Sequence, residues 1–244
     1  MTDETSNGAP MRAAGGRLAR VQRALRDSRV LIVLDLICVA GVFVADKVYH
    51  VIWLSETLYL FALGVASLLL RGVKWSEIGW RFGRGFWPMV AIGLAGGAMI
   101  EAQELYFTQP LLIAVTGRLP DLSDFHGIRG NWKMLALGVP FIWGLAAFGE
   151  EWVYRGWLTN RFADLFGRKW VGWLLATACA SVVFGLAHLY QGPVGMIEAG
   201  VDGALFALLY FATGRNLIAP MIAHGVQDSI DLILGFTGHY PIPF

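Results

Sequence analysis

The chain has 244 residues, of which 56% are apolar and only 15% are charged, and its formal net charge is +1. This composition is too apolar for an ordinary soluble domain, so the chain is expected to lie in a bilayer with membrane lipids around it. The balanced charge, without a basic face, makes a nucleic-acid partner unexpected. Cys38 and Cys179 lie in apolar runs, where a thiol is usually a packing residue rather than half of a disulfide.

Seven long apolar runs follow one another, at approximately 30–46, 51–70, 86–107, 134–158, 171–190, 194–212 and 216–235. Each approaches the ~20 residues that a helix needs to cross ~30 Å of hydrocarbon, and none shows the alternation of a strand. The sequence therefore predicts an all-α, polytopic membrane helical bundle of about seven transmembrane helices. Residues 30–244 are expected to form a single membrane-embedded domain.

The preceding segment, 1–29, is a basic N-terminal tail. Residues 1–11 are expected to be disordered, and 12–29 either form a basic helix on anionic lipid headgroups or act only as a topology signal. Of the nineteen Lys and Arg residues, fifteen fall in this tail and in the segments on the same side of the predicted bundle. A cytoplasmic N-terminus therefore satisfies the positive-inside rule.

Charged residues inside the apolar runs need an explanation, because a charge at the centre of a bilayer costs at least about 2.5–3.5 kcal/mol. Most of them lie near the end of a predicted span, where water or an arginine can reach them. For these residues we expect structural pairing or exposure at the membrane rim. They are Asp35, Glu56, Glu101, Glu104, Glu198 and Asp202.

The stretch FGEEWVYRGWL, residues 148–158, differs because it places three charges together in an apolar run. Glu151 and Arg155 are four residues apart, so on a helix they share a face and the arginine can neutralise this carboxylate. Glu150 points about 100° away and has no such partner. One glutamate is thus predicted to be structural and the other to be free for chemistry.

Two histidines lie inside the predicted spans, each four residues from a matching partner. His188 follows Phe184 in FGLAH, and His224 precedes Asp228 in HGVQD. An intramembrane histidine is often only a hydrogen-bonded core residue, but two on different helices favour a shared site with Glu150.

The ordered motifs EExxxR, FxxxH and HxxxD on successive helices resemble the CAAX protease and bacteriocin-processing (CPBP) family, which includes the Ras-converting CAAX prenyl endopeptidase. The resemblance covers about residues 134–235. It implies an intramembrane, glutamate-dependent endopeptidase with no metal and no cofactor, acting on a membrane-associated and in some cases lipid-modified peptide or protein. It also favours a bacterial inner membrane as the location.

By this resemblance, Glu150 is the general base that activates water and His188 holds that water. His224 and Asp228 stabilise the oxyanion, while Glu151, Arg155 and Phe184 support the site. The prenyl endopeptidases carry asparagine where this chain has Asp228. An ionised aspartate cannot donate a hydrogen bond, so either Asp228 is protonated or it orients a charged His224, which is then the donor. We favour the second interpretation.

Other chemistries remain open on residue types alone. The motifs HExxH, GxGD and GxSxG of other membrane proteases do not occur, but two histidines and a carboxylate also suit zinc. A protein without enzymatic activity, either a membrane scaffold or a proton or small-molecule transporter, could use the same polar cluster. The sequence does not identify the substrate or its cleavage site.

Overall fold

The computed structural model describes residues 20–26, 28–83 and 85–242, and these residues contain helices and no strands. Most of the expected tail, including the segment expected to be disordered, lies outside the described residues. The helices are α2 (Arg29–Lys47), α3 (Glu56–Arg71), α4 (Phe86–Gln103), α5 (Gln109–Thr116), α6 (Trp132–Phe141), α7 (Thr159–Phe166), α8 (Trp170–Ala187), α9 (Gly192–Ala212) and α10 (Ile218–Thr237). The predicted all-α class is confirmed.

Several neighbouring helices join into longer units through π-helical turns. The turn η2 (Glu104–Thr108) links α4 to α5, and η4 (Ile142–Glu150) and η5 (Trp152–Leu158) link α6 to α7. The fourth unit therefore runs over Trp132–Phe166 and is 35 residues long. It ends at Phe166, before Gly167, and so extends past residue 158, where the fourth apolar run ends. The third unit likewise extends past the expected residue 107 to Thr116.

Local signals explain where the helices begin and end. The side chain of Ser55 accepts a hydrogen bond from the Thr57 N–H at 3.2 Å, so α3 begins at Glu56 rather than near residue 51, the expected boundary. Gly72 follows α3 with a φ of +59°, a conformation that glycine adopts without strain. The helix α8 ends at Ala187, and His188 is its C-cap.

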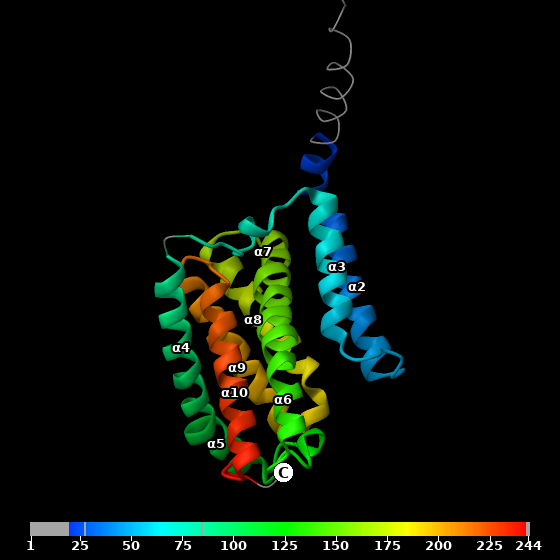
Figure 1. Ribbon diagram of the computed structural model, residues 1–244. Helices are drawn as coiled ribbons and strands as arrows, with labels where there is room; N and C mark the ends of the chain where they lie inside the picture. The colour runs from blue at the N-terminus through cyan, green and yellow to red at the C-terminus, as the bar shows by residue number, and fades with distance from the viewer. Residues whose placement is uncertain (1–19, 27, 84, 243–244) are drawn as a thin grey trace, which may run out of the picture.

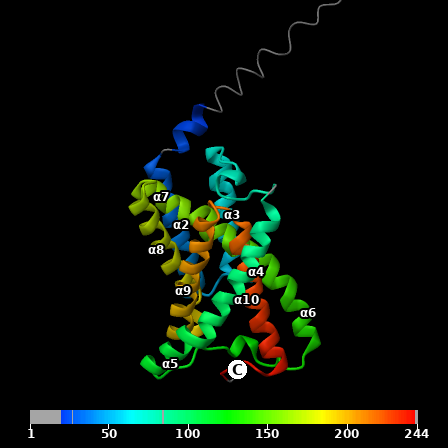
Figure 2. The same cartoon turned by 90° about the vertical axis from the view of Figure 1, so that its left-hand side faces the viewer.

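The long units form one bundle. Figure 1 shows the α2–α3 pair on one side and α4 on the other, with the α6–α7 unit between them. Figure 2 shows α8 and α9 on one side of α10 and α6 on the other. Gly93 lets α4 approach α10 closely, because a Cβ added there would lie 2.7 Å from the carbonyl oxygen of Ala219. Small residues at helix contacts are typical of membrane bundles.

A cluster of buried aromatic side chains joins the α2–α3 pair to the rest of the bundle. Trp152 and Trp157 are fully buried, and the ring of Trp152 lies 4.5 Å from that of Phe61 and 5.2 Å from that of Trp75. Burying rings of this size contributes strongly to packing. The α3 helix is therefore fixed against the helix that carries the EExxxR motif.

Two of the intramembrane acids have the partners expected of them. Asp35 pairs with Arg71 at 2.9 Å, and Glu56 pairs with Lys47 at 3.2 Å. Outside the apolar helices, Arg26 pairs with Glu77 at 2.9 Å. Burial alone would favour neutral Glu77, but the N–H of Lys74 and the guanidinium of Arg26 outweigh it and lower the pKa of Glu77 below 4.5.

Length and apolar composition identify three helices able to cross a membrane, namely Trp132–Phe166, Trp170–Ala187 and Leu189–Ala212. A fourth candidate is the bent pair of Arg20–Arg26 and Arg29–Lys47. The chain is therefore an integral membrane protein with three to four clear candidate spans among its described residues. The other long helices are too short or not apolar enough to be identified in this way, and α3, for example, has only 16 residues.

Candidate active site

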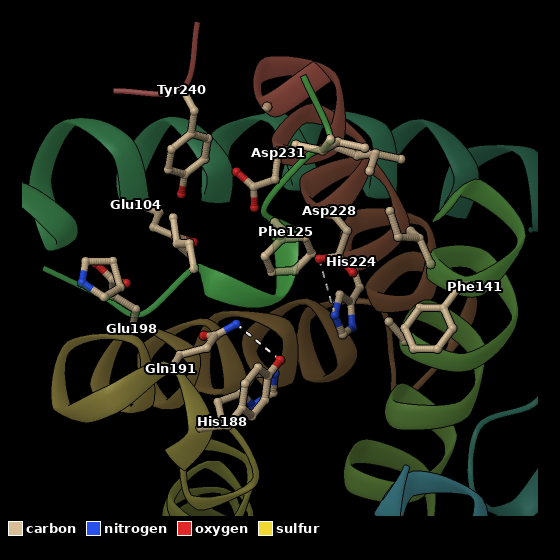
Figure 3. Close-up of a pocket in the computed structure, with 18 of the residues that line it drawn as sticks. Glu104, Phe125, Phe141, His188, Gln191, Glu198, His224, Asp228, Asp231 and Tyr240 are labelled. Atoms are coloured by element: carbon tan, nitrogen blue, oxygen red, sulfur yellow. Dashed lines mark hydrogen bonds and ion pairs between the residues drawn. The ribbon is translucent and has the colours of Figure 1, made fainter. Parts of the chain in front are cut away.

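One cavity of about 210 Å³ is lined by all four residues that the sequence predicted to be catalytic. Glu150 ends the π-helical turn η4, His188 follows α8, and both His224 and Asp228 lie on α10. Loop 117–131 and the C-terminal segment complete the lining with Pro120, Leu122, Phe125, Ile128 and Tyr240. Figure 3 shows His188, His224 and Asp228 in this cavity.

The carboxylate of Glu150 has only one hydrogen-bond partner among the described residues. The hydroxyl of Thr57 on α3 donates to its Oε1 at 3.4 Å, which is a long hydrogen bond. Its Oε2 is buried and has no hydrogen-bond partner among the described residues. Gly149 allows α3 to come this close, since a Cβ there would lie 3.2 Å from Cγ2 of Thr57. The carboxylate therefore keeps one oxygen available as a hydrogen-bond acceptor.

Glu151 is fully buried and holds two cationic or potentially cationic groups. Its Oε1 accepts from Nη1 of Arg155 at 2.8 Å and lies 2.9 Å from Nδ1 of His224. The predicted Glu151–Arg155 pair is confirmed in geometry. The contact with His224 joins the α6–α7 unit to α10, and a spacing rule within one helix does not predict it. Glu151 is thus the residue that orients the ring of His224.

Two phenylalanines enclose this ion pair. The guanidinium of Arg155 lies over the ring of Phe184 at 4.4 Å and over that of Phe206 at 5.2 Å. The ring of Phe206 also stacks on His224, with 4.7 Å between centroids and 21° between planes. Aromatic faces attract cations, so both rings stabilise the arginine in a dry environment. Phe184 was predicted from the FGLAH motif, whereas Phe206 belongs to none of the three motifs and was not predicted.

The position of His188 at the end of α8 fixes its tautomer. Nδ1 lies 2.9 Å from the carbonyl oxygen of Phe184, and a carbonyl can only accept, so this nitrogen carries the proton. In the neutral ring Nε2 is then an acceptor. The four-residue spacing to Phe184 thus reflects a backbone contact as well as ring packing at 4.8 Å.

Asp228 approaches His224 without a hydrogen bond. Its Oδ1 lies 3.6 Å from Nε2 of His224, and this separation is too long for such a bond. Because Nδ1 must donate to the Glu151 carboxylate, Nε2 carries an N–H toward the cavity only when the ring is cationic. The imidazole therefore lies between two carboxylates, one close and one more distant.

The remaining intramembrane acids contradict the expectation of pairing or rim exposure. Glu101, Glu104, Glu198 and Asp202 are only 2%, 8%, 5% and 7% exposed, and no Lys or Arg is recorded in a salt bridge with them in the described part of the chain. They lie on three different helices that face one another, together with Asp231 on α10. The expectation failed because these acids lie on helix faces that contact other helices, so distance from a span end does not predict exposure.

Within the described residues, no group of three or more His, Cys, Asp or Glu side chains has the arrangement to hold a metal ion. The polar groups of the candidate site instead face the cavity singly or in pairs. A carboxylate with a free oxygen, a neutral imidazole and a second imidazole held by a carboxylate are the components of water activation and oxyanion binding.

Comparison with protein families gives a match over residues 132–230, to the model described as type II CAAX prenyl endopeptidase Rce1-like. No curated protein and no solved structure gives a significant match. The matched segment begins with α6, ends within α10 and contains all seven residues that the sequence placed in or around the site. The chain therefore carries, over residues 132–230, a domain similar to the Rce1-like CAAX prenyl endopeptidases.

Proposed function

We propose that the protein is a glutamate-dependent intramembrane endopeptidase that hydrolyses a peptide bond in a membrane-associated peptide or protein, with or without a lipid modification. The observation that carries this proposal is the single cavity in which Glu150, His188 and His224 meet. The family match supports the reaction class. The roles of the individual residues follow from the geometry of their free atoms.

Glu150 acts as the general base. Its Oε2 has no competing donor among the described residues, so it accepts a proton from a water molecule that attacks the carbonyl carbon of the scissile bond. His188 accepts a second hydrogen bond from that water through Nε2, because its Nδ1 is occupied by Phe184. When the C–N bond breaks, protonated Glu150 gives the proton to the leaving amine.

His224 stabilises the oxyanion of the tetrahedral intermediate. Its Nε2–H donates to this oxygen, and Glu151 holds the ring through Nδ1. A ring that carries both protons is cationic, and the carboxylates of Glu151 and Asp228 on either side favour that charge. Asp228 in this proposal supplies an electrostatic contribution, and the orienting hydrogen bond comes from Glu151. No metal or cofactor takes part in the proposed reaction.

Seven helical units cross the membrane in the proposed topology, and residues 30–244 act as one domain. The described ends that carry Arg26, Arg71, Lys74, Arg168 and Arg215 face the cytoplasm of a bacterial cell, by the positive-inside rule. Loop 117–131, which lines the cavity, lies at the opposite end of the bundle (Figure 1). The cavity therefore opens toward the extracytoplasmic half of the inner membrane.

Accessibility of a single cysteine tests this orientation. In a Cys38→Ser/Cys179→Ser background, we expect Ser123→Cys in loop 117–131 to react with a membrane-impermeant maleimide on intact cells. Lys74→Cys is expected to react only after the cells are opened. The reverse pattern would place the cavity on the cytoplasmic side.

The reaction is tested with purified wild type and Glu150→Gln, a variant of the same shape that cannot act as a base. Both are incubated with a pooled library of membrane peptides and prenylated peptides, with and without a strong chelator. Cleavage that survives chelation and is lost in the variant supports the proposal, provided both proteins melt at the same temperature. Sensitivity to the chelator would favour zinc instead. Unchanged cellular function of Glu150→Gln would favour a scaffold or transport role.

A further inference from the structure

A buried acidic chamber adjoins the candidate catalytic residues. We use this name for the carboxyl groups of Glu101, Glu104, Glu198, Asp202 and Asp231. They come from α4 and η2, from α9 and from α10. On each of the three helical units two acids are three or four residues apart, counting Asp228 with Asp231, so each pair shares a helix face.

The chamber is continuous with the reaction site. Glu104, Glu198 and Asp231 line the same cavity as Glu150 and His188. An adjoining cavity of about 100 Å³ is lined by Asp202 and Gln227 as well, and it also reaches His188 and His224. Figure 3 shows the carboxyl group of Asp231 and the hydroxyl of Tyr240 turned toward the space beside Glu104.

Neutral groups supply the hydrogen bonds that the chamber receives. Nε2 of Gln227 donates to Glu104 at 2.6 Å and to Asp202 at 3.0 Å, so one amide serves two acids. Among the described residues that line the two cavities, none is lysine or arginine. Carboxyl groups are therefore concentrated in the chamber, and no basic side chain lines it.

One buried carboxyl oxygen at the wall of both cavities lacks a partner. Glu198 is 5% exposed and lines both cavities, and its Oε1 has no hydrogen-bond partner among the described residues. Asp231, by contrast, shares a hydrogen bond with Glu101. Buried polar atoms without partners are uncommon and costly in native proteins. The presence of one at the wall of a substrate cavity indicates a donor that arrives with a ligand.

We infer that the acidic chamber is a subsite for a positively charged side chain, lysine or arginine, of the peptide whose bond lies at Glu150. This inference rests on the proposed protease function. An ammonium group brings three donors and a guanidinium five, on stems long enough to reach several separate acids. A metal ion fits less well, because no three such ligands in the described part of the chain converge on one point.

Binding to a form that cannot cleave tests the subsite. Glu150→Gln protein in lipid nanodiscs is mixed with two pools of twelve-residue peptides. Each peptide has one central residue between random apolar flanks, and this residue is lysine in one pool and acetyl-lysine in the other. Captured peptides are counted by mass spectrometry. We expect enrichment of the lysine form by about tenfold, the size of one charge-assisted hydrogen bond.

Variants then locate the preference. Glu198→Gln and Asp231→Asn, each combined with Glu150→Gln and each checked for an unchanged melting temperature, are expected to reduce the enrichment severalfold. The matched control is Asp124→Asn, which removes an exposed acid from the loop at the same end of the bundle. Equal capture of both pools, or capture of neither, would overturn the inference. So would stabilisation by a divalent metal in place of any lysine preference.

The readout separates this inference from the proposed reaction. Lysine-selective capture without cleavage by wild type would remove the protease mechanism and leave the subsite in place. Cleavage by wild type without any preference for lysine would overturn the subsite and leave the protease mechanism in place. Each proposal can therefore fail without the other.

Discussion

Replacing Glu151 by glutamine tests the most connected ionic contact of the bundle. Glu151 and Arg155 are 0% and 3% exposed at their side chains and lie 2.8 Å apart. Glutamine keeps the shape but removes the charge, so Arg155 is left as an uncompensated buried cation. Losing one partner of such a pair typically costs about 3–5 kcal/mol. For a chain of this size we expect the melting temperature to fall by roughly 6–20 °C.

The assay is thermal unfolding in detergent, followed by the fluorescence of the buried tryptophans. Arg168→Gln serves as the control, because Arg168 forms a pair of the same i,i+4 spacing with Asp164 but is 45% exposed at its side chain. Exposed pairs contribute at most about 1 kcal/mol, so this variant is expected to melt within about 4 °C of wild type.

A double variant separates charge from packing. Glu151→Gln/Arg155→Met removes the stranded cation and is expected to recover much of the lost stability, although His224 loses its orienting contact and cleavage stays absent. The reasoning is refuted if Glu151→Gln melts within about 4 °C of wild type. It is also refuted if the double variant melts no higher than the single one.

Other substitutions test separate parts of the structure. His188→Ala is expected to abolish turnover with an unchanged melting temperature. Asp228→Asn is expected to keep substantial activity, because Glu151 makes the contact that orients His224. Cleavage assays with purified enzyme measure both. Gly93→Ala should destabilise the helix contact by about 1–3 kcal/mol, while Gly41→Ala, with open space around it, should not. The contribution of ionised Glu77 to the free energy of unfolding is fully present above pH 4.5 and is lost as the pH falls through its lowered pKa. The free energies of unfolding of wild type and Glu77→Gln should therefore become equal in acid.

The sequence predicts well what depends on neighbouring residues. Apolar runs gave the helical class, and the four-residue spacing gave the pair of Glu151 with Arg155. Contacts between helices are harder to predict from the sequence, because the sequence of a helix that is apolar on every side does not show which face contacts which neighbour. The contact of Glu151 with His224 and the stacking of Phe206 on that ring are of this kind.

The sequence also does not predict the π-helical turns. A π-turn depends on the balance of packing around the helix, and the run from 142 to 158 contains no residue that requires one. The acidic chamber, in contrast, corresponds to a pattern that is visible in the sequence. Glu101 with Glu104 and Glu198 with Asp202 each share a helix face, and such pairs indicate a polar wall more strongly than single acids do.

Thr57, Gly93 and Glu104 all lie outside residues 132–230, yet the first donates to Glu150, the second lets α4 reach the helix that carries His224, and the third lines the cavity. The recognisable motif region is therefore not a transferable module. Grafting it into another membrane protein would carry over the reactive side chains and leave behind part of the walls around them. In this chain, a complete site requires the whole bundle.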